Sequence, residues 1–194
     1  MTTIRKPEGD FYNQWIQSIG VPIYRGHIVS NIKNLELSWW EERQCSAAFL
    51  QLQSMEGLSE ARVTEIPPGK TLPPVKFALG EIVYVVEGQG LCSVWSGNGP
   101  RKTFEWQAHS MFHLPRYSFH QFTNARGDKP ARLFHYNYLP FAMTVAPDPD
   151  FFFNNPHEDS AILYGQDGDP FSHARAVMSA GTKDSNAEAW GATI

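Results

Sequence analysis

Cysteine is scarce in this chain: its 194 residues include only Cys45 and Cys92, far apart and without a CxxC spacing. This scarcity excludes a disulfide scaffold and a zinc finger, and it is typical of buried thiols in a reducing compartment. The N-terminal residues MTTIRKPEGDFYNQW contain no apolar stretch and no small-residue cleavage site. We therefore expect no secretory signal and a cytoplasmic protein.

Basic residues are too few for a nucleic-acid-binding surface. Lys and Arg number 16 against 20 Asp and Glu, so we expect no binding to a phosphate backbone by charge. No apolar run approaches the roughly 20 residues of a membrane span. With 42% apolar and 13% aromatic residues, however, the chain has enough apolar surface for a packed core. The expected partners are small molecules or other proteins.

Short alternating or apolar runs, separated by Gly, Pro and Asn turns, fill the middle of the chain. This pattern is typical of an antiparallel sandwich or barrel. No helix-period segment lies between the runs, which favours a jelly roll over a parallel α/β sheet. Strands are expected at 48–53, 61–66, 81–86, 91–95, 110–114, 118–123 and 132–138.

Two arms differ in character from this middle part. We divide the chain into an N-terminal arm, a barrel and a C-terminal arm, at 1–44, 45–140 and 141–194. In the N-terminal arm, apolar residues at spacings of three and four predict a short helix over 11–19.

The C-terminal arm begins in a proline-rich segment, 140–156, that includes three consecutive phenylalanines at 151–153. Such a cluster is costly to leave in water, so we expect an irregular arm that packs across the sheet or onto a partner subunit. Further on, Asp169, Pro170 and Gly181 stand where a cap, a first-turn proline and a terminal glycine predict a second short helix.

The stretch 67–90, PPGKTLPPVKFALGEIVYVVEGQG, resembles the first conserved motif of the cupin superfamily. In that motif two histidines and a glutamate lie at fixed spacing between two glycines. Counting from Gly69 places the glutamate at Glu81. The same count puts Val75 and Phe77 where the histidines are usual. The spacing is kept, whereas both histidines are missing.

A second stretch, 109–124, HSMFHLPRYSFHQFTN, resembles the second cupin motif through Pro115, His120 and Asn124. The resemblance implies an all-β fold, the cupin-type double-stranded β-helix or jelly-roll barrel, with short helices in the two arms. The phrases that flank the motifs also resemble those of the N-terminal barrel in two-barrel cupin proteins of about twice this length.

The resemblance also implies a metal site, because a typical cupin holds Fe, Mn, Zn or Ni with three histidines and one glutamate. Of that ligand set this sequence keeps only Glu81 and His120. Catalytic metal sites normally supply three protein ligands. The sequence therefore favours a barrel without the usual divalent metal.

His113 and His135 offer a second route to a metal site. Each lies on an expected strand, and because side chains alternate between the faces of a sheet, each has an even chance of facing inward. Together with Glu81 and His120 they would supply the ligands of a metal-dependent dioxygenase. The alternative is that both are hydrogen-bonded strand histidines without a metal.

In the absence of a metal, Glu81 and His120 are the candidate catalytic residues. A carboxylate with a raised pKa in an aromatic cavity, next to an imidazole, is the arrangement of a general acid and base. The alternative is a carboxylate at a strand edge, paired with Lys76 or Arg116. A buried Glu81 needs a partner, and that partner decides between the two interpretations.

Val75, Phe77 and Phe122 are the candidate pocket residues, since they would form an apolar wall beside this polar pair. An apolar cavity with a few polar groups is the usual form of a small-molecule site. The alternative is that these side chains belong to the ordinary core.

Two functions follow from these observations. The first is a cupin-like protein that binds an apolar or aromatic small molecule, and we favour an enzyme of oxygenase, isomerase or lyase chemistry over a pure binding protein. The second is a non-catalytic structural or regulatory lobe that associates with another barrel, as a homodimer or with a partner chain.

Overall fold

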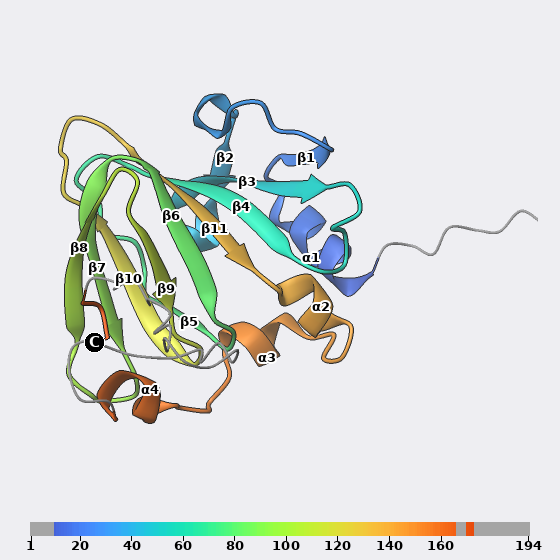
Figure 1. Ribbon diagram of the computed structural model, residues 1–194. Helices are drawn as coiled ribbons and strands as arrows, with labels where there is room; N and C mark the ends of the chain where they lie inside the picture. Colours follow the sequence, from blue (N-terminus) through green and yellow to red (C-terminus); the bar gives the residue numbers. More distant parts are fainter. Residues whose placement is uncertain (1–9, 166–169, 173–194) are drawn as a thin grey trace, which may run out of the picture.

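The computed structural model describes residues 10–165 and 170–172, which form two facing β-sheets with short helices around them (Figure 1). The strands are β1 (Ile23–Gly26), β2 (Ser38–Trp40), β3 (Cys45–Leu52), β4 (Glu60–Ile66), β5 (Val75–Phe77), β6 (Glu81–Glu87), β7 (Gln89–Trp95), β8 (Lys102–Gln107), β9 (Met111–Leu114), β10 (Ser118–Asn124) and β11 (Ala131–Asn137). The helices are α1 (Phe11–Ile19), α2 (Leu139–Met143), α3 (Pro149–Phe153), α4 (Ser160–Tyr164) and the short 3-10 turns η1 (Ile32–Asn34) and η2 (Glu41–Arg43).

The strands β4 to β11 have the order of a jelly roll. One sheet contains β4-β11-β6-β9, extended by β3, β1 and β2, and the other contains β5-β10-β7-β8. Along the chain, each step between these strands crosses to the opposite sheet, except the step from β7 to β8. The cupin-type fold expected from the sequence is confirmed. In the described part of the chain no strand pair joins the two sheets, so the expected barrel is an open sandwich.

All seven expected strands are present, with their ends shifted by a few residues. Alternate burial is clearest in β10 and β11, where every second residue is buried. The structure adds strands that the sequence did not indicate, among them β5 and β8. The first is short, and the second exposes charged and polar residues between its aromatic ones.

A buried asparagine of the second motif fastens the loops at one end of the sandwich. The Asn124 amide donates to the backbone carbonyls of Ile66, Pro67 and Lys129 at 3.2, 3.2 and 2.9 Å. Its side-chain oxygen accepts from the backbone N–H of Arg126 at 2.9 Å. This residue therefore joins the end of β10 to the chain that follows β4.

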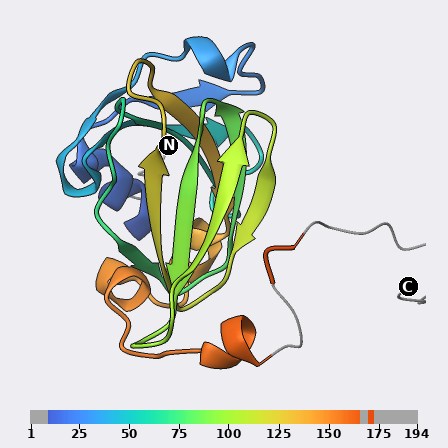
Figure 2. The same cartoon turned by 90° about the vertical axis from the view of Figure 1, so that its left-hand side faces the viewer.

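The expected helix over 11–19 is confirmed as α1. The Asp10 side chain caps it by accepting from the Asn13 backbone N–H at 2.8 Å, and Gly20 ends it with a left-handed φ of 79°. Its buried face, Tyr12 and Ile16, packs into an apolar cluster with α2, α3 and β3. Figure 2 shows α2 and α3 together at one end of the sheets.

The proline-rich segment differs from its expected irregular course, because two short helices, α2 and α3, form within it. A proline lies in the first turn of each, where its missing N–H costs no hydrogen bond. Phe152 is buried and Phe153 packs against the same cluster, so this arm packs on its own chain. Most of the helix expected over 169–181 lies outside the described residues.

Candidate functional site

A cavity lies between the two sheets, at the end that the arms cover. Its walls come from β4 and β11 of one sheet and from β5 and β10 of the other, and its volume is about 50 Å³. Val75, Phe77 and Phe122, the candidate pocket residues, all line it. His120 lies on the same wall, directly across the strand pair from Val75.

An aromatic cap formed by Trp15, Trp40, Phe77 and Phe153 closes this end of the cavity. The Phe153 ring stacks on Trp15 at 5.4 Å and on Phe77 at 5.1 Å between centroids. Trp40 meets Trp15 edge to face at 6.3 Å. Since α1 and α3 contribute Trp15 and Phe153, and β2 at the side of the first sheet contributes Trp40, elements outside the strands β4 to β11 complete the site.

His120 is a buried side chain that faces the cavity and meets the Phe122 ring edge to face at 5.6 Å between centroids. Its exposed fraction is 7%, and no hydrogen bond joins its ring to any described residue. Burial lowers the pKa of His120 to about 3, although Glu81 acts in the opposite direction. The ring is therefore neutral near pH 7, with one nitrogen as donor and the other as acceptor.

Glu81 is buried, as its motif position implied, but it is fully engaged by neighbours on its own sheet. Its Oε1 accepts from Arg62 Nη2 at 2.7 Å and from Asn137 Nδ2 at 3.0 Å, and its Oε2 pairs with His135 Nδ1 at 2.9 Å. Burial alone would raise the pKa of Glu81, but Arg62 and then His135 hold that pKa well below its usual range. The raised pKa expected for a general acid is therefore wrong.

The partner of Glu81 is thus Arg62, rather than the expected Lys76 or Arg116. Lys76 lies over the Phe119 ring, 5.5 Å from its centroid. Arg116 pairs with Asp159 at 3.2 Å.

His135 joins Glu81 to the cavity wall. Burial and the nearby Arg62 lower the pKa of His135, so its ring is neutral near pH 7. A carboxylate only accepts, so His135 Nδ1 carries the proton and donates to Glu81. Nε2 then accepts from the Thr64 hydroxyl at 2.9 Å.

A second carboxylate completes this buried network. Glu60 Oε1 accepts from Arg62 Nη1 and, at 3.1 Å, from Asn137 Nδ2. Burial and the nearby Glu60 carboxylate raise the pKa of Tyr12. The Tyr12 side chain of α1 therefore lies next to this network. The strand register produces the grouping, because Arg62 lies opposite His135, and Glu60 opposite Asn137, across β4 and β11.

These residues do not fit the metal site that the fold family implies. The nitrogens of His135 and both oxygens of Glu81 are already hydrogen-bonded, and the Arg62 guanidinium places a positive charge where a cation would bind. Within the described ranges, no three His, Cys, Asp or Glu side chains are grouped closely enough to hold a metal ion.

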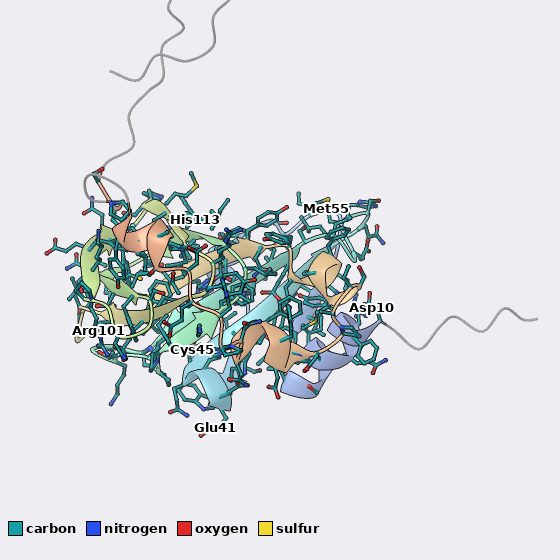
Figure 3. The ribbon with its side chains drawn as sticks, turned by 90° about the horizontal axis from the view of Figure 1, so that it is seen from below. Asp10, Glu41, Cys45, Met55, Arg101 and His113 are labelled. Carbon is teal, nitrogen blue, oxygen red and sulfur yellow. The ribbon has the colours of Figure 1, made fainter. Side chains whose placement is uncertain are left out.

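His113 takes no part in this cluster, and the expected four-residue set is not brought together. It lies opposite Ile82 in the pairing of β9 with β6, on the outer face of the sheet, whereas Glu81 and Leu114 face inward. Figure 3 shows His113 at the edge of the molecule, away from Cys45 in the cavity wall. Of the two histidines with an even chance of facing inward, His135 faces the interior between the sheets and His113 faces outward.

Sequence analysis missed Arg62, Arg43 and the aromatic cap. A signal for the first was present, because Glu60, Arg62 and Thr64 alternate along one strand and so share a face. His135 and Asn137 have the same spacing on another expected strand. Polar residues at alternate positions of two strands indicate that a polar cluster lies on the inner face of the sheet. The cap had no comparable signal, since its rings come from separate elements.

Comparisons with known proteins concern the fold. No family model and no curated protein matches the chain. Among solved structures, the cupin domain of Schizosaccharomyces pombe Cnp3 is similar at 18% identity and a TM-score of 0.45, over 57% of this chain and 68% of that one. The Drosophila melanogaster CENP-C cupin domain is similar at 14% identity and a TM-score of 0.46, over 63% and 90%.

Lactobacillus farciminis oxalate decarboxylase, solved as a formate complex, is similar at 17% identity and a TM-score of 0.46. The match covers 66% of this chain and 33% of that protein, so it spans about a third of the enzyme. None of the helices in residues 10–165 and 170–172 has the length and apolar character needed to cross a membrane. The strand order, with the first motif on β5 and β6 and the second on β9 and β10, shows that this chain has a cupin-type jelly-roll fold.

Proposed function

We propose that this protein binds a small apolar or aromatic molecule in the cavity between its sheets. The observation that carries the proposal is the His120 imidazole, more than nine-tenths buried, facing an aromatic cavity without a hydrogen-bond partner in the described chain. Its ring nitrogens are not among the completely buried polar atoms without a partner, so they open onto the cavity, where such groups are normally satisfied by protein, water or a ligand. A polar atom of a bound ligand would satisfy this one, and the surrounding rings would bury its apolar part.

The volume limits the size of the ligand. About 50 Å³ is far below the roughly 300–1,000 Å³ of sites for drug-sized molecules. A single aromatic ring or a short aliphatic chain is therefore the upper limit of size that we propose for the ligand. Flat rings are favoured, because Trp15, Phe77 and Phe153 already stack on one another along one wall.

Glu81 supports this site from behind. Its oxygens hold His135 and Arg62, which themselves line the cavity, whereas Glu81 does not. We therefore assign it the role of a positioning residue, and His120 that of the residue that contacts the ligand. These two roles concern ligand binding alone, and neither residue is assigned a catalytic step.

Titration with benzyl alcohol tests the proposal. Tryptophan fluorescence and thermal unfolding detect the binding. Saturable binding should change the emission of Trp15 and Trp40, and a ligand at 100 times its Kd should stabilise the protein by about 2.7 kcal/mol. Val75→Phe should abolish the response, because the new ring fills the cavity beside His120.

Ile28→Phe is the matched control. It introduces the same ring at a side chain that is 78% exposed and outside the cavity, and it should bind like the wild type. If benzyl alcohol and related one-ring compounds leave emission and unfolding unchanged at millimolar concentration, or if both variants respond alike, the cavity is not the binding site.

A further inference from the structure

Arg43 is a cation in the cavity wall that makes no ion pair with the described residues. It ends η2, and its guanidinium lies 4.8 Å from the centroid of the Phe153 ring and 5.4 Å from that of Trp40. No hydrogen bond or ion pair joins it to a residue of the described chain. Burial lowers the pKa of Arg43, while the charges of Glu42 and Glu81 act in the opposite direction without touching it, and an arginine stays charged in a protein.

The other arginine of the cavity is different. Arg62 is held by two carboxylates, Glu60 and Glu81, and carries no uncompensated charge. No Asp or Glu side chain within the described ranges lines the cavity itself. Of the two arginines that line the cavity, Arg43 is therefore the one that no carboxylate of the described residues contacts directly.

Arg43 and His120 act on one another across this space. Both side chains line the same cavity, and Arg43 disfavours protonation of His120. A neutral His120 still offers an N–H donor. Arg43 presents the N–H groups of its guanidinium to the cavity, and His120 presents a single N–H. Neither side chain has a hydrogen-bond partner among the described residues.

Resting on the proposed function, we infer that the ligand is a small aromatic carboxylate whose carboxylate is bound by Arg43 and His120. Its ring would lie against the aromatic cap, and its negative charge would compensate Arg43. A planar carboxylate matches the guanidinium fork with two parallel hydrogen bonds.

Calorimetric titration of the full chain with benzoate and with benzyl alcohol, a neutral compound of similar size, tests the inference. Wild-type protein should prefer benzoate by about tenfold or more, since hydrogen bonds to charged groups contribute that much. Arg43→Met, which keeps the apolar stem and removes the charge, should reduce this preference about tenfold. Arg43→Lys, which keeps the charge, should retain part of it.

Arg101→Met is the matched control, because Arg101 also lies over a tryptophan, 4.1 Å from the centroid of the Trp95 ring. Figure 3 shows Arg101 well apart from Glu41, the first residue of the turn that ends in Arg43. This variant should keep the wild-type preference for benzoate.

The outcomes separate the two proposals. Equal affinity of the wild-type protein for benzoate and benzyl alcohol overturns the inference and leaves the proposed function standing. An Arg43→Met variant that unfolds like the wild type but weakens both compounds equally also overturns it, because Arg43 then only shapes the cap. If neither compound binds the wild-type protein, the proposed function itself fails. The wild-type comparison does not depend on the folding of any variant.

Discussion

Arg62 is the residue on which the buried polar network depends. It lies between two carboxylates, those of Glu60 and Glu81, whose side chains are almost completely buried. A buried charge that loses its partner costs far more than the intact pair contributes, because the remaining charge has no water to solvate it. Loss of one partner of an ion pair on the surface has little effect on stability, because water solvates the remaining charge.

Arg62→Met should therefore lower the free energy of unfolding by about 3–5 kcal/mol at pH 7. Urea denaturation measures the loss. Arg126→Met breaks an exposed pair with Asp128 at 2.8 Å and should leave the stability close to that of the wild type, because water solvates both charges. Equal losses in the two variants would show that the network around Glu81 is accessible to water.

His120 predicts how stability depends on pH. Its folded pKa of about 3 lies below the roughly 6.5 of an unfolded histidine, so the unfolded state binds more protons below pH 6.5. Stability should fall as the pH decreases from 6.5 toward 3. The lowered pKa of Glu81 adds a further loss only below its unfolded value, about 4.3.

Between pH 6.5 and 5 the buried histidines therefore dominate the predicted loss. Urea denaturation over this range should show a shallower decrease for His120→Leu than for the wild type, with the rest arising from His135, whose pKa is also lowered. His27→Leu, at an exposed histidine, is the control variant. A His120→Leu profile parallel to that of the wild type would contradict the burial of an uncharged ring.

At the scale of the element, close approach of strands decides which glycines are required. A Cβ added to Gly90 in β7 would lie 2.0 Å from the Thr123 carbonyl oxygen and 2.5 Å from the Trp106 ring. Gly127, in the loop after β10, has no heavy atom within 4 Å of that position. The two sites therefore differ in space, while the substitution is the same.

Gly90→Ala should lower the free energy of unfolding by about 1–3 kcal/mol or more, because β10 or the indole must shift. Gly127→Ala should stay within about 0.5 kcal/mol of the wild type. Chemical denaturation of the two variants side by side makes the comparison. A tolerant Gly90 would mean that β7 and β10 are less tightly paired than the structure indicates.

The predictability of an element depended on how regular its pattern was. Alternation gave β10 and β11, because one face of each is buried and the other is not. The short strand β5 and the helices α2 and α3 were missed, since a few residues are too short to display a period. Those elements form because long-range packing holds them.

At the scale of the whole molecule, the association expected from the sequence stays a prediction. Two of the three consecutive phenylalanines pack on their own chain, which weakens the original argument for a partner. An apolar surface remains on α2, α3 and the link between them, where Phe141, Val145 and Phe151 are 54, 81 and 47% exposed. Such a surface favours contact with a second copy.

Sedimentation velocity should accordingly detect a dimer at tens of micromolar protein. The double substitution Phe141→Ser and Phe151→Ser should shift it to the single-chain mass of 21.9 kDa. Met111→Ser, at a side chain that is 72% exposed on the sheet edge, should leave the dimer intact. Wild-type protein that sediments at the single-chain mass at every concentration would end this proposal.

The fold and the inward direction of Glu81 and His120 were predictable from the amino-acid sequence. Hydrophobic alternation, turn residues and motif spacing act over short stretches, and each is visible in the chain. The surroundings of these two side chains were not predictable in this way. Arg62 of β4 forms the ion pair with Glu81, and Arg43 of η2 lines the same cavity as His120. Packing brings both arginines near residues that are distant in the sequence. Electrostatics depends on distance in space, so the charge state and chemistry of this cavity emerged only when the sheets and arms were assembled.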